Sequence, residues 1–240
     1  MVDVLAIGAH PDDIELRIGS TLAGLTRRGR SVAITHLTRG ELSTRGTPEA
    51  RAQEAAAAAE ELGATSMEIL DLGDGRLRDT TENRNAIIDA IRRLSPRLLL
   101  SPYPTDEHPD HGVAGALTKA AWYLAGIRKA GSPDLAPHRP EQIWFYPGHA
   151  VPEIQLVVAC TREDVDAKRR ALACYRSQFH NPDSAEPETR ISSPSFLAEG
   201  EARMVHFGSL IGAPFGEPFH LQGPLGVSDV ARLLDETPSA

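Results

Sequence analysis

The chain has 240 residues and a formal net charge of −8, with 41% hydrophobic and 24% charged residues. This composition is that of an ordinary globular protein, and the length is enough to bury one large core. The acidic balance argues against nucleic acid and anionic membrane surfaces as partners, because both bind basic surfaces. No apolar run in the sequence approaches the roughly 20 residues that a membrane helix needs.

The two cysteines, Cys160 and Cys174, are too few for a disulfide framework. Low cysteine usage is typical of a reducing compartment. The first strand is expected to begin by residue 3, which leaves no room for a signal peptide before it. We therefore expect a cytoplasmic protein.

Helices and strands are expected to alternate from the start of the chain. The apolar run at residues 4–7 is typical of a strand buried on both faces. A helix over 18–28 and a second strand over 31–37 follow. The Thr-Pro-Glu sequence at 47–49 predicts a helix start, because it combines an N-cap threonine, a proline at the first helical position and an acid in the first turn. Gly63 is expected to end that helix.

The same alternation continues through the middle of the chain. We expect a strand at 67–70, a helix capped by Thr81 and running to residue 94, a buried strand at 97–101, and a helix after His111. This order implies an α/β fold with a Rossmann-like, mostly parallel sheet and helices on both faces.

Beyond residue 140 the pattern is less regular. A loop rich in Pro, Ser and Glu is expected at 180–195, and a tail rich in Gly and Pro after residue 210. The remaining expected elements are strands at 142–146 and 154–159, a helix from a capping box at Thr161 and Asp164 to about residue 175, and a helix at 195–210.

Two clusters of histidine and aspartate stand where buried strands are expected to end. Ala9-His-Pro-Asp-Asp13 follows the apolar run at 4–7, and His108-Pro-Asp-His111 follows the leucine run at 98–100. In an open parallel sheet, ligand sites form at the carboxyl ends of strands, so both clusters should lie on the same rim. Imidazole and carboxylate groups together predict a divalent-metal site.

His10, Asp13 and His111 would supply two nitrogens and one carboxylate, the set that leaves a catalytic metal one open position. Zinc suits these ligands, and Fe²⁺ also accepts a site of two histidines and one carboxylate. Such a metal lowers the pKa of bound water to about 7. Asp12, which is left unligated, would then take a proton from the water as general base. The sequence therefore predicts a metal-dependent hydrolase.

His108 is the remaining imidazole of the two clusters. It would stabilise charge on a tetrahedral intermediate or protonate a leaving amine, with Asp110 bonded to its far nitrogen to fix the tautomer. Each cluster alone has a plainer interpretation, as helix-capping acids at 12–13 and as a surface loop at 108–111. Their occurrence together at matched strand ends favours the metal site.

Further motifs resemble those of the PIG-L/LmbE-like N-deacetylases. The resemblance rests on the two clusters, on Leu37-Thr-Arg-Gly-Glu41, on Arg51 with Glu54, and on Tyr175-Arg-Ser-Gln-Phe179. Members of this family are Rossmann-like, zinc-dependent enzymes that remove acetyl groups from N-acetylglucosamine derivatives. The similarity runs through most of the chain and is most specific in the paired metal motifs.

The resemblance implies the same metal ligands and the same base, and it adds roles for other side chains. It makes His108 the electrostatic partner of the base or the general acid, and it makes Arg51 a substrate contact. Arg39 and Glu41 follow the second expected strand, and either a substrate contact or an ion pair within the loop fits them. Gln178 fits a hydrogen bond to a sugar hydroxyl or a structural bond.

The chain resembles most the deacetylases of bacillithiol biosynthesis, which hydrolyse N-acetylglucosaminyl-malate to glucosaminyl-malate and acetate. The Thr-Arg-Gly-Glu-Leu segment and Glu201-Ala-Arg203 favour this branch. The resemblance implies a small amino-sugar substrate and a homo-oligomer, since relatives are often oligomers, including hexamers. Departures from the pattern are Arg17 and Ser20 in place of a Gly-rich segment, Glu107 where close relatives often have Arg, and Phe215 where a Tyr would polarise the acyl oxygen.

Two other functions stay open. A deacetylase or amidase for another amino-sugar or antibiotic-like conjugate would use the same site with a different pocket. A nucleotide-binding or metal-sensing module would need a Gly-rich loop after the first strand, where this chain has His-Pro-Asp-Asp.

No linker marks a second domain, so we expect one domain over residues 1–240. Within it, residues 1–130 would form the Rossmann-like half that carries the metal motifs. Residues 140–240 would complete the sheet and the pocket as an irregular C-terminal extension.

Overall fold

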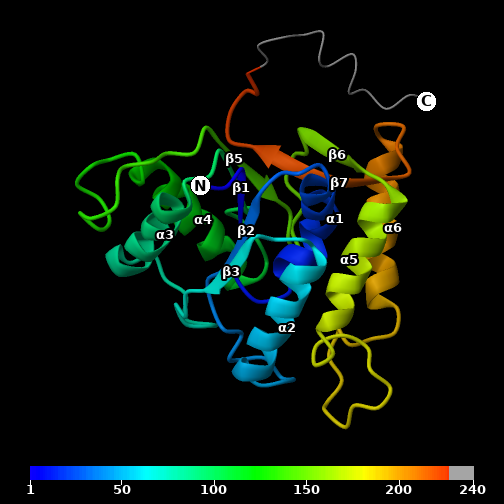
Figure 1. Ribbon diagram of the computed structural model, residues 1–240. Helices are drawn as coiled ribbons and strands as arrows, with labels where there is room; N and C mark the ends of the chain where they lie inside the picture. Colours follow the sequence, from blue (N-terminus) through cyan, green and yellow to red (C-terminus); the bar gives the residue numbers. More distant parts are fainter. Residues whose placement is uncertain (227–240) are drawn as a thin grey trace.

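The strands form one sheet in the computed structural model, which describes residues 1–226 (Figure 1). The strand order is β3-β2-β1-β4-β5-β7-β6, with β3 to β5 parallel and β7 antiparallel to both of its neighbours. The strands are β1 Val4–Gly8, β2 Val32–His36, β3 Ser66–Ile69, β4 Leu98–Pro102, β5 Gln142–Tyr146, β6 Leu156–Cys160 and β7 Phe215–Leu221.

Helices cover both faces of this sheet, as the predicted Rossmann-like α/β fold requires, and that prediction is confirmed. Helices α1, α2 and α5 pack on one face, α3 and α4 pack on the other, and α6 packs against β6 and β7. The helices are α1 Asp13–Arg27, α2 Pro48–Glu61, α3 Thr81–Leu94, α4 Pro109–Leu124, α5 Arg162–Cys174 and α6 Phe196–Ser209.

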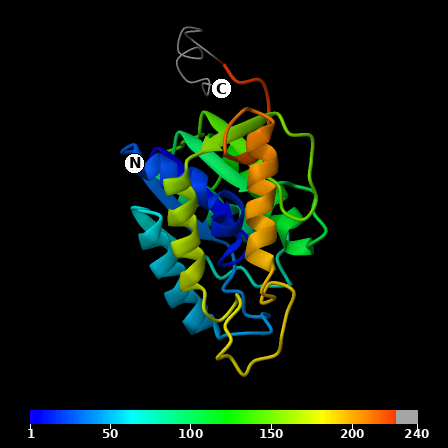
Figure 2. The ribbon, with the colours of Figure 1, turned by 90° about the vertical axis from the view of Figure 1, so that its right-hand side faces the viewer.

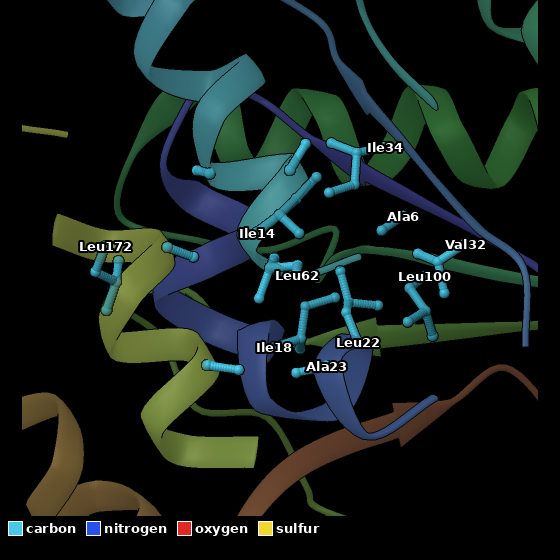
Figure 3. Packing of buried hydrophobic residues seen from close by; sticks show 14 of the residues in the cluster. Ala6, Ile14, Ile18, Leu22, Ala23, Val32, Ile34, Leu62, Leu100 and Leu172 are labelled. Atoms are coloured by element: carbon cyan, nitrogen blue, oxygen red, sulfur yellow. The ribbon is translucent and has the colours of Figure 1, made fainter. Parts of the chain in front are cut away.

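Alternate residues of β1 point into two separate cores. Ala6 lies in the cluster beneath α1, α2 and α5, together with Ile14 and Leu22 (Figure 3). Leu5 and Ile7 lie in the cluster beneath α3 and α4. Each buried leucine or isoleucine contributes about 1.5–3 kcal/mol relative to an exposed one. A strand covered on both faces therefore appears in sequence as a continuous apolar run.

The two metal motifs follow neighbouring strands. β1 pairs with β4 in parallel register, with Val4 opposite Leu98 and Ala6 opposite Leu100. β2 and β3 continue the sheet on one side and β5 on the other, so the connections after β1 and β4 diverge. This divergence makes a topological switch point, where a crevice forms at the carboxyl ends of the strands.

Helix α1 bends at Ile18, whose φ of −134° is not helical. The bend leaves the amides of Ser20 and Thr21 to donate to the carboxylate of Glu217 in β7, at 3.1 and 2.7 Å. Glu217 also accepts from Lys168 Nζ at 2.8 Å, and both side chains are buried. The second half of α1 thus has its own cap, and it begins close to residue 18, where the sequence predicts the helix start.

Several boundaries differ from the sequence-based expectations. Helix α1 begins at Asp13, and α4 begins at Pro109 with His108 as its N-cap, so both metal motifs enter the first helical turns. Thr80 rather than Thr81 caps α3. The expected capping box of Thr161 and Asp164 at the start of α5 is present.

The expected irregular tail is the largest difference, because residues 215–221 form β7 between β5 and β6. Glycine and proline within this segment hide the strand pattern. The part of the predicted tail after residue 226 lies outside the described residues. Across residues 1–226, none of the helices combines the length and the apolarity required to traverse a bilayer.

Candidate metal centre

The first motif turns sharply between β1 and α1. Asp12 has a φ of 108°, in the left-handed region that L side chains rarely adopt, and it occupies the N-cap position of α1. The His10 amide donates to Asp13 Oδ2 at 2.8 Å, which closes the turn. This backbone directs the neighbouring Asp12 and Asp13 into two different environments.

His10, Asp13 and His111 converge at the rim. Asp13 Oδ2 lies 3.3 Å from His10 Nδ1, and Asp13 Oδ1 lies 3.1 Å from His111 Nε2. One ligand atom from each residue lies within 4.8 Å of the others, and all three side chains are buried. Two imidazole nitrogens and a carboxylate are a donor set that fits a divalent transition metal. The structure thus brings together the three residues that the sequence predicts as ligands.

The far nitrogens of both histidines face carboxylates. His10 Nε2 lies 3.1 Å from Asp74 Oδ1 and 3.2 Å from Asp110 Oδ2. His111 Nδ1 lies 3.3 Å from Asp106 Oδ1. Histidines that bind a metal commonly donate their other nitrogen to a carboxylate, which fixes the ring. These contacts therefore support His10 Nδ1 and His111 Nε2 as the nitrogens that face the metal.

These acids also set the protonation of the imidazoles. Burial disfavours the charged form of His10, but its bonds with Asp110, Asp13 and Asp74 raise its pKa well above the usual value. Burial also disfavours the charged form of His111. The charge of Asp13 and the bond with Asp106 outweigh this effect and raise the pKa of His111 to about 9. A bound cation would take the place of these protons.

The Asp12 carboxylate is directed toward Arg51. Asp12 Oδ2 accepts from Arg51 Nη2 at 3.0 Å, and both side chains are buried. Burial raises the pKa of Asp12 to about 6, and the positive charge of Arg51 limits the rise. A carboxylate with a pKa near neutrality is suited to act as general base.

Arg51 is held among backbone carbonyls rather than facing open space. Its guanidinium donates to Pro11 O and, at 3.2 Å, to Gly40 O. Gly40 has a φ of 67°, and a Cβ there would lie 2.0 Å from Arg51 Nη1. Only glycine therefore allows the guanidinium this position. The predicted contact of Arg51 with substrate stays a prediction, since the structure places Arg51 beside the predicted base.

His108 and Asp110 contact each other differently from our expectation. The backbone amide of Asp110, rather than its carboxylate, donates to His108 Nδ1 at 3.2 Å, as is usual for an N-cap residue. The Asp110 carboxylate instead contacts His10 and accepts from the Gly75 amide at 2.6 Å. When neutral, His108 must therefore carry its proton on Nε2. Burial and the nearby charge of His111 lower the pKa of His108.

The three remaining predicted substrate residues form contacts within the protein. Arg39 Nη2 donates to Glu49 at 2.9 Å on the surface. Glu41 accepts from the amides of Arg39 and Asp74, at 3.2 and 2.9 Å. Buried Gln178 bonds with Ser43 Oγ at 3.0 Å and with a backbone carbonyl at 2.8 Å. Their roles toward substrate stay predictions.

Sequence reasoning missed three residues of this centre: Asp74, Asp106 and His149. Asp74 lies in a Gly-Asp-Gly segment, and Asp106 lies two residues before His108. His149 Nδ1 lies 3.1 Å from Asp106 Oδ1, and its ring stacks 5.4 Å from that of His111. The signal available for Asp106 was its closeness to the second motif. His149 follows β5, the strand next to β4, at the same rim.

The chain is similar to known proteins in sequence and in fold. The family model described as PIG-L, GlcNAc-PI de-N-acetylase, matches residues 5–122, which include both motifs. A diacetylchitobiose deacetylase of Thermococcus kodakarensis is 33% identical over 190 residues, covering 73% of this chain and 70% of the relative. The chain belongs to the PIG-L family.

Two further proteins are similar to this chain. A conserved protein of Thermus thermophilus matches with a TM-score of 0.85 and 37% identity, covering 95% of this chain and 97% of that one. A 4-oxalmesaconate hydratase of Pseudomonas putida is 30% identical over 199 residues, covering 73% of this chain and 74% of the relative. The predictions of a PIG-L/LmbE-like protein and of an N-deacetylase enzyme are confirmed.

Proposed function

We propose that this PIG-L protein uses zinc to remove the acetyl group from the N-acetylglucosamine part of a small conjugate, with N-acetylglucosaminyl-malate as the favoured substrate. The main support for this reaction is the buried carboxylate of Asp12, which is not one of the predicted metal ligands. It lies beside a converging set of two histidines and one carboxylate. The choice of malate rests on the resemblance to the bacillithiol branch. A deacetylase for another N-acylated amino-sugar conjugate is the alternative.

His10 Nδ1, the Asp13 carboxylate and His111 Nε2 would hold the metal. When bound, the metal supplies Lewis-acid chemistry, which polarises the amide carbonyl and makes water more acidic. Asp106, Asp74 and Asp110 keep the two rings oriented through their far nitrogens.

Asp12 takes the proton of the attacking water as the oxygen bonds to the acetyl carbon. Arg51 keeps the Asp12 carboxylate in place and favours its ionised form. His108, with its proton on Nε2, donates to the oxygen on which negative charge develops. The carbon–nitrogen bond then breaks, acetate leaves, and the proton held by Asp12 passes to the amine.

The test is release of acetate and free amine from N-acetylglucosaminyl-malate and from N-acetylglucosamine. Enzyme stripped of metal and then reloaded with zinc or Fe²⁺ identifies the active ion. We expect activity only in reloaded enzyme, with a higher rate on the malate conjugate. Comparable rates on both compounds would contradict malate specificity and favour the alternative.

A hydratase would instead add water to a carbon–carbon double bond. The panel therefore includes 4-oxalmesaconate, the compound in the name of the Pseudomonas putida relative. Hydration of that compound by an enzyme that releases no acetate from either amide would overturn the proposal.

We also propose an oligomeric state and a cellular location for the enzyme. A homo-oligomer, with a hexamer as one form, and a cytoplasmic location follow from the resemblance and from cysteine usage. Light scattering after size-exclusion chromatography measures the oligomeric state, and a monomeric mass would contradict that part of the proposal.

A further inference from the structure

A cavity of about 630 Å³ lies between α1, α5 and α6. Figure 2 shows α1 between the other two helices on this side of the molecule. Arg17 of α1, Lys168 of α5 and Arg203 of α6 line the cavity, and Glu107 and His149 lie at one end. A cavity of this size can hold the second half of a small conjugate.

The end lined by His149 adjoins the metal centre. His149 contacts Asp106, which in turn contacts the predicted ligand His111. Arg17 lies about one helical turn after the predicted ligand Asp13, on the same helix α1. A ligand with its amide at the metal would extend along this cavity.

Two of the cations around the cavity are already neutralised. Lys168 Nζ forms a buried ion pair with Glu217 at 2.8 Å. Arg169 donates to Glu201 at 2.7 Å. Arg190, Glu107 and Glu199 also line the cavity, but they are exposed, so solvent screens their charges.

Arg17 and Arg203 differ from these cations. Within residues 1–226, neither guanidinium has a carboxylate within 4.0 Å, and Arg17 Nε is buried without a hydrogen-bond partner. Burial and the charge of Arg17 lower the pKa of Arg203. Two partly buried like charges without a counter-ion are unfavourable. An anionic ligand would relieve this cost.

We propose that Arg17 and Arg203 bind an anionic group, a carboxylate or a phosphate, on the half of the substrate that is not acetylated. Guanidinium groups suit such anions because their planar donors form paired hydrogen bonds. This inference rests on the proposed deacetylation and specifies the class of substrate for that reaction. It places anion recognition on α1 and α6.

The kinetic test compares conjugates that differ in charge. The substrates are N-acetylglucosaminyl-malate, N-acetylglucosamine 1-phosphate and the neutral methyl N-acetylglucosaminide, each with zinc-loaded full-length enzyme. We expect Arg17→Gln and Arg203→Gln to raise KM for the preferred anionic substrate about tenfold and to leave kcat/KM for the neutral one within about twofold. The larger effect, on malate or on phosphate, identifies the anion.

Two control variants separate charge from folding. Arg203→Lys should keep most of the anion preference, because it keeps the positive charge. Arg170→Gln removes an exposed arginine of α5 that lies outside the cavity and pairs with Glu61, and it should change neither KM. Equal losses on charged and neutral substrates, or no loss on either, would overturn the inference.

Calorimetric binding of malate and of inorganic phosphate to zinc-loaded enzyme tests the site without turnover. Binding that disappears in the Arg17→Gln/Arg203→Gln double variant supports the anion site even if no amide is hydrolysed, in which case only the deacetylation proposal fails. Binding that survives in the double variant points to the metal itself and contradicts the inference, as does the absence of binding in the unmodified enzyme.

Discussion

Adjacent aspartates at the start of α1 have opposite surroundings. Asp13 contacts both predicted histidine ligands, whereas Asp12, at a φ of 108°, contacts the Arg51 guanidinium. A non-glycine residue in this backbone region costs about 1–3 kcal/mol and persists where surrounding contacts enforce it. The sequence alone indicated a ligand and a base here, but the role of Arg51 beside the base depends on a contact between distant segments.

This difference predicts separable effects of two conservative changes. Asp12→Asn should keep the metal and lower kcat about 10²–10⁴-fold, since it removes only the base. Asp13→Asn should lose the metal, because the carboxylate ligand is gone. Metal content by mass spectrometry, measured alongside acetate release, checks both. Near-normal activity and metal content in both variants would contradict the assignment, and Asp166→Asn, at a half-exposed position of α5, is the control.

At the scale of the element, the apolar runs predicted the parallel strands because burial on both faces requires continuous hydrophobicity. β7 was missed because Gly216 and Pro218 break such a run, and because its pairing with β5 and β6 joins segments far apart in sequence. The bend of α1 was missed for the same reason. It is stabilised by Glu217, a residue of β7.

The buried pair of Lys168 and Glu217 predicts a large loss of stability when one partner is removed. Lys168→Met leaves the Glu217 carboxylate buried without its counter-charge, which should cost about 3–5 kcal/mol. Urea denaturation measures the change in the free energy of unfolding. Lys119→Met, at an exposed position of α4, should change it by less than about 0.5 kcal/mol. Equal effects of the two changes would contradict this account.

The capping box of α5 predicts a pH-dependent contribution. Burial opposes ionisation of Asp164, but bonds from Thr161 and Arg27 lower its pKa below the usual 3.8. A lowered pKa in the folded state stabilises the fold above pH 3.8, and the contribution is lost as pH falls through the folded value. Asp164→Asn should therefore cost about 1 kcal/mol at pH 7. Urea denaturation should show a smaller difference between the two proteins below pH 3.8, and an unchanged difference would contradict the argument.

At the scale of the whole molecule, the strand order places the two metal motifs at one switch point, and α5 and α6 add the walls of the adjoining cavity. The predicted division into residues 1–130 and 140–240 stays a proposal. In it, the first part supplies the ligands and the second part supplies much of the pocket. His149 of the second part contacts Asp106 and stacks on the ring of His111, both in the first part.

Metal binding should stabilise this whole assembly. Zinc at 100 times its dissociation constant adds about 2.7 kcal/mol to the folded state, which corresponds to a rise in Tm of about 5–10 °C for a chain of this length. Differential scanning calorimetry before and after chelation measures the shift. The Asp13→Asn variant should show little shift, and an equal shift in that variant would place the stabilising zinc elsewhere.

The position of β7 also has a consequence for synthesis. β6 has β7 as its strand neighbour, and β7 is translated only after α5 and α6. While the nascent chain emerges from the ribosome, β6 therefore has no strand to pair with. The edge of β5 that later pairs with β7 is unpaired during the same time. The parallel half can assemble first, whereas the cavity wall and the cap of α1 must form near the end of translation.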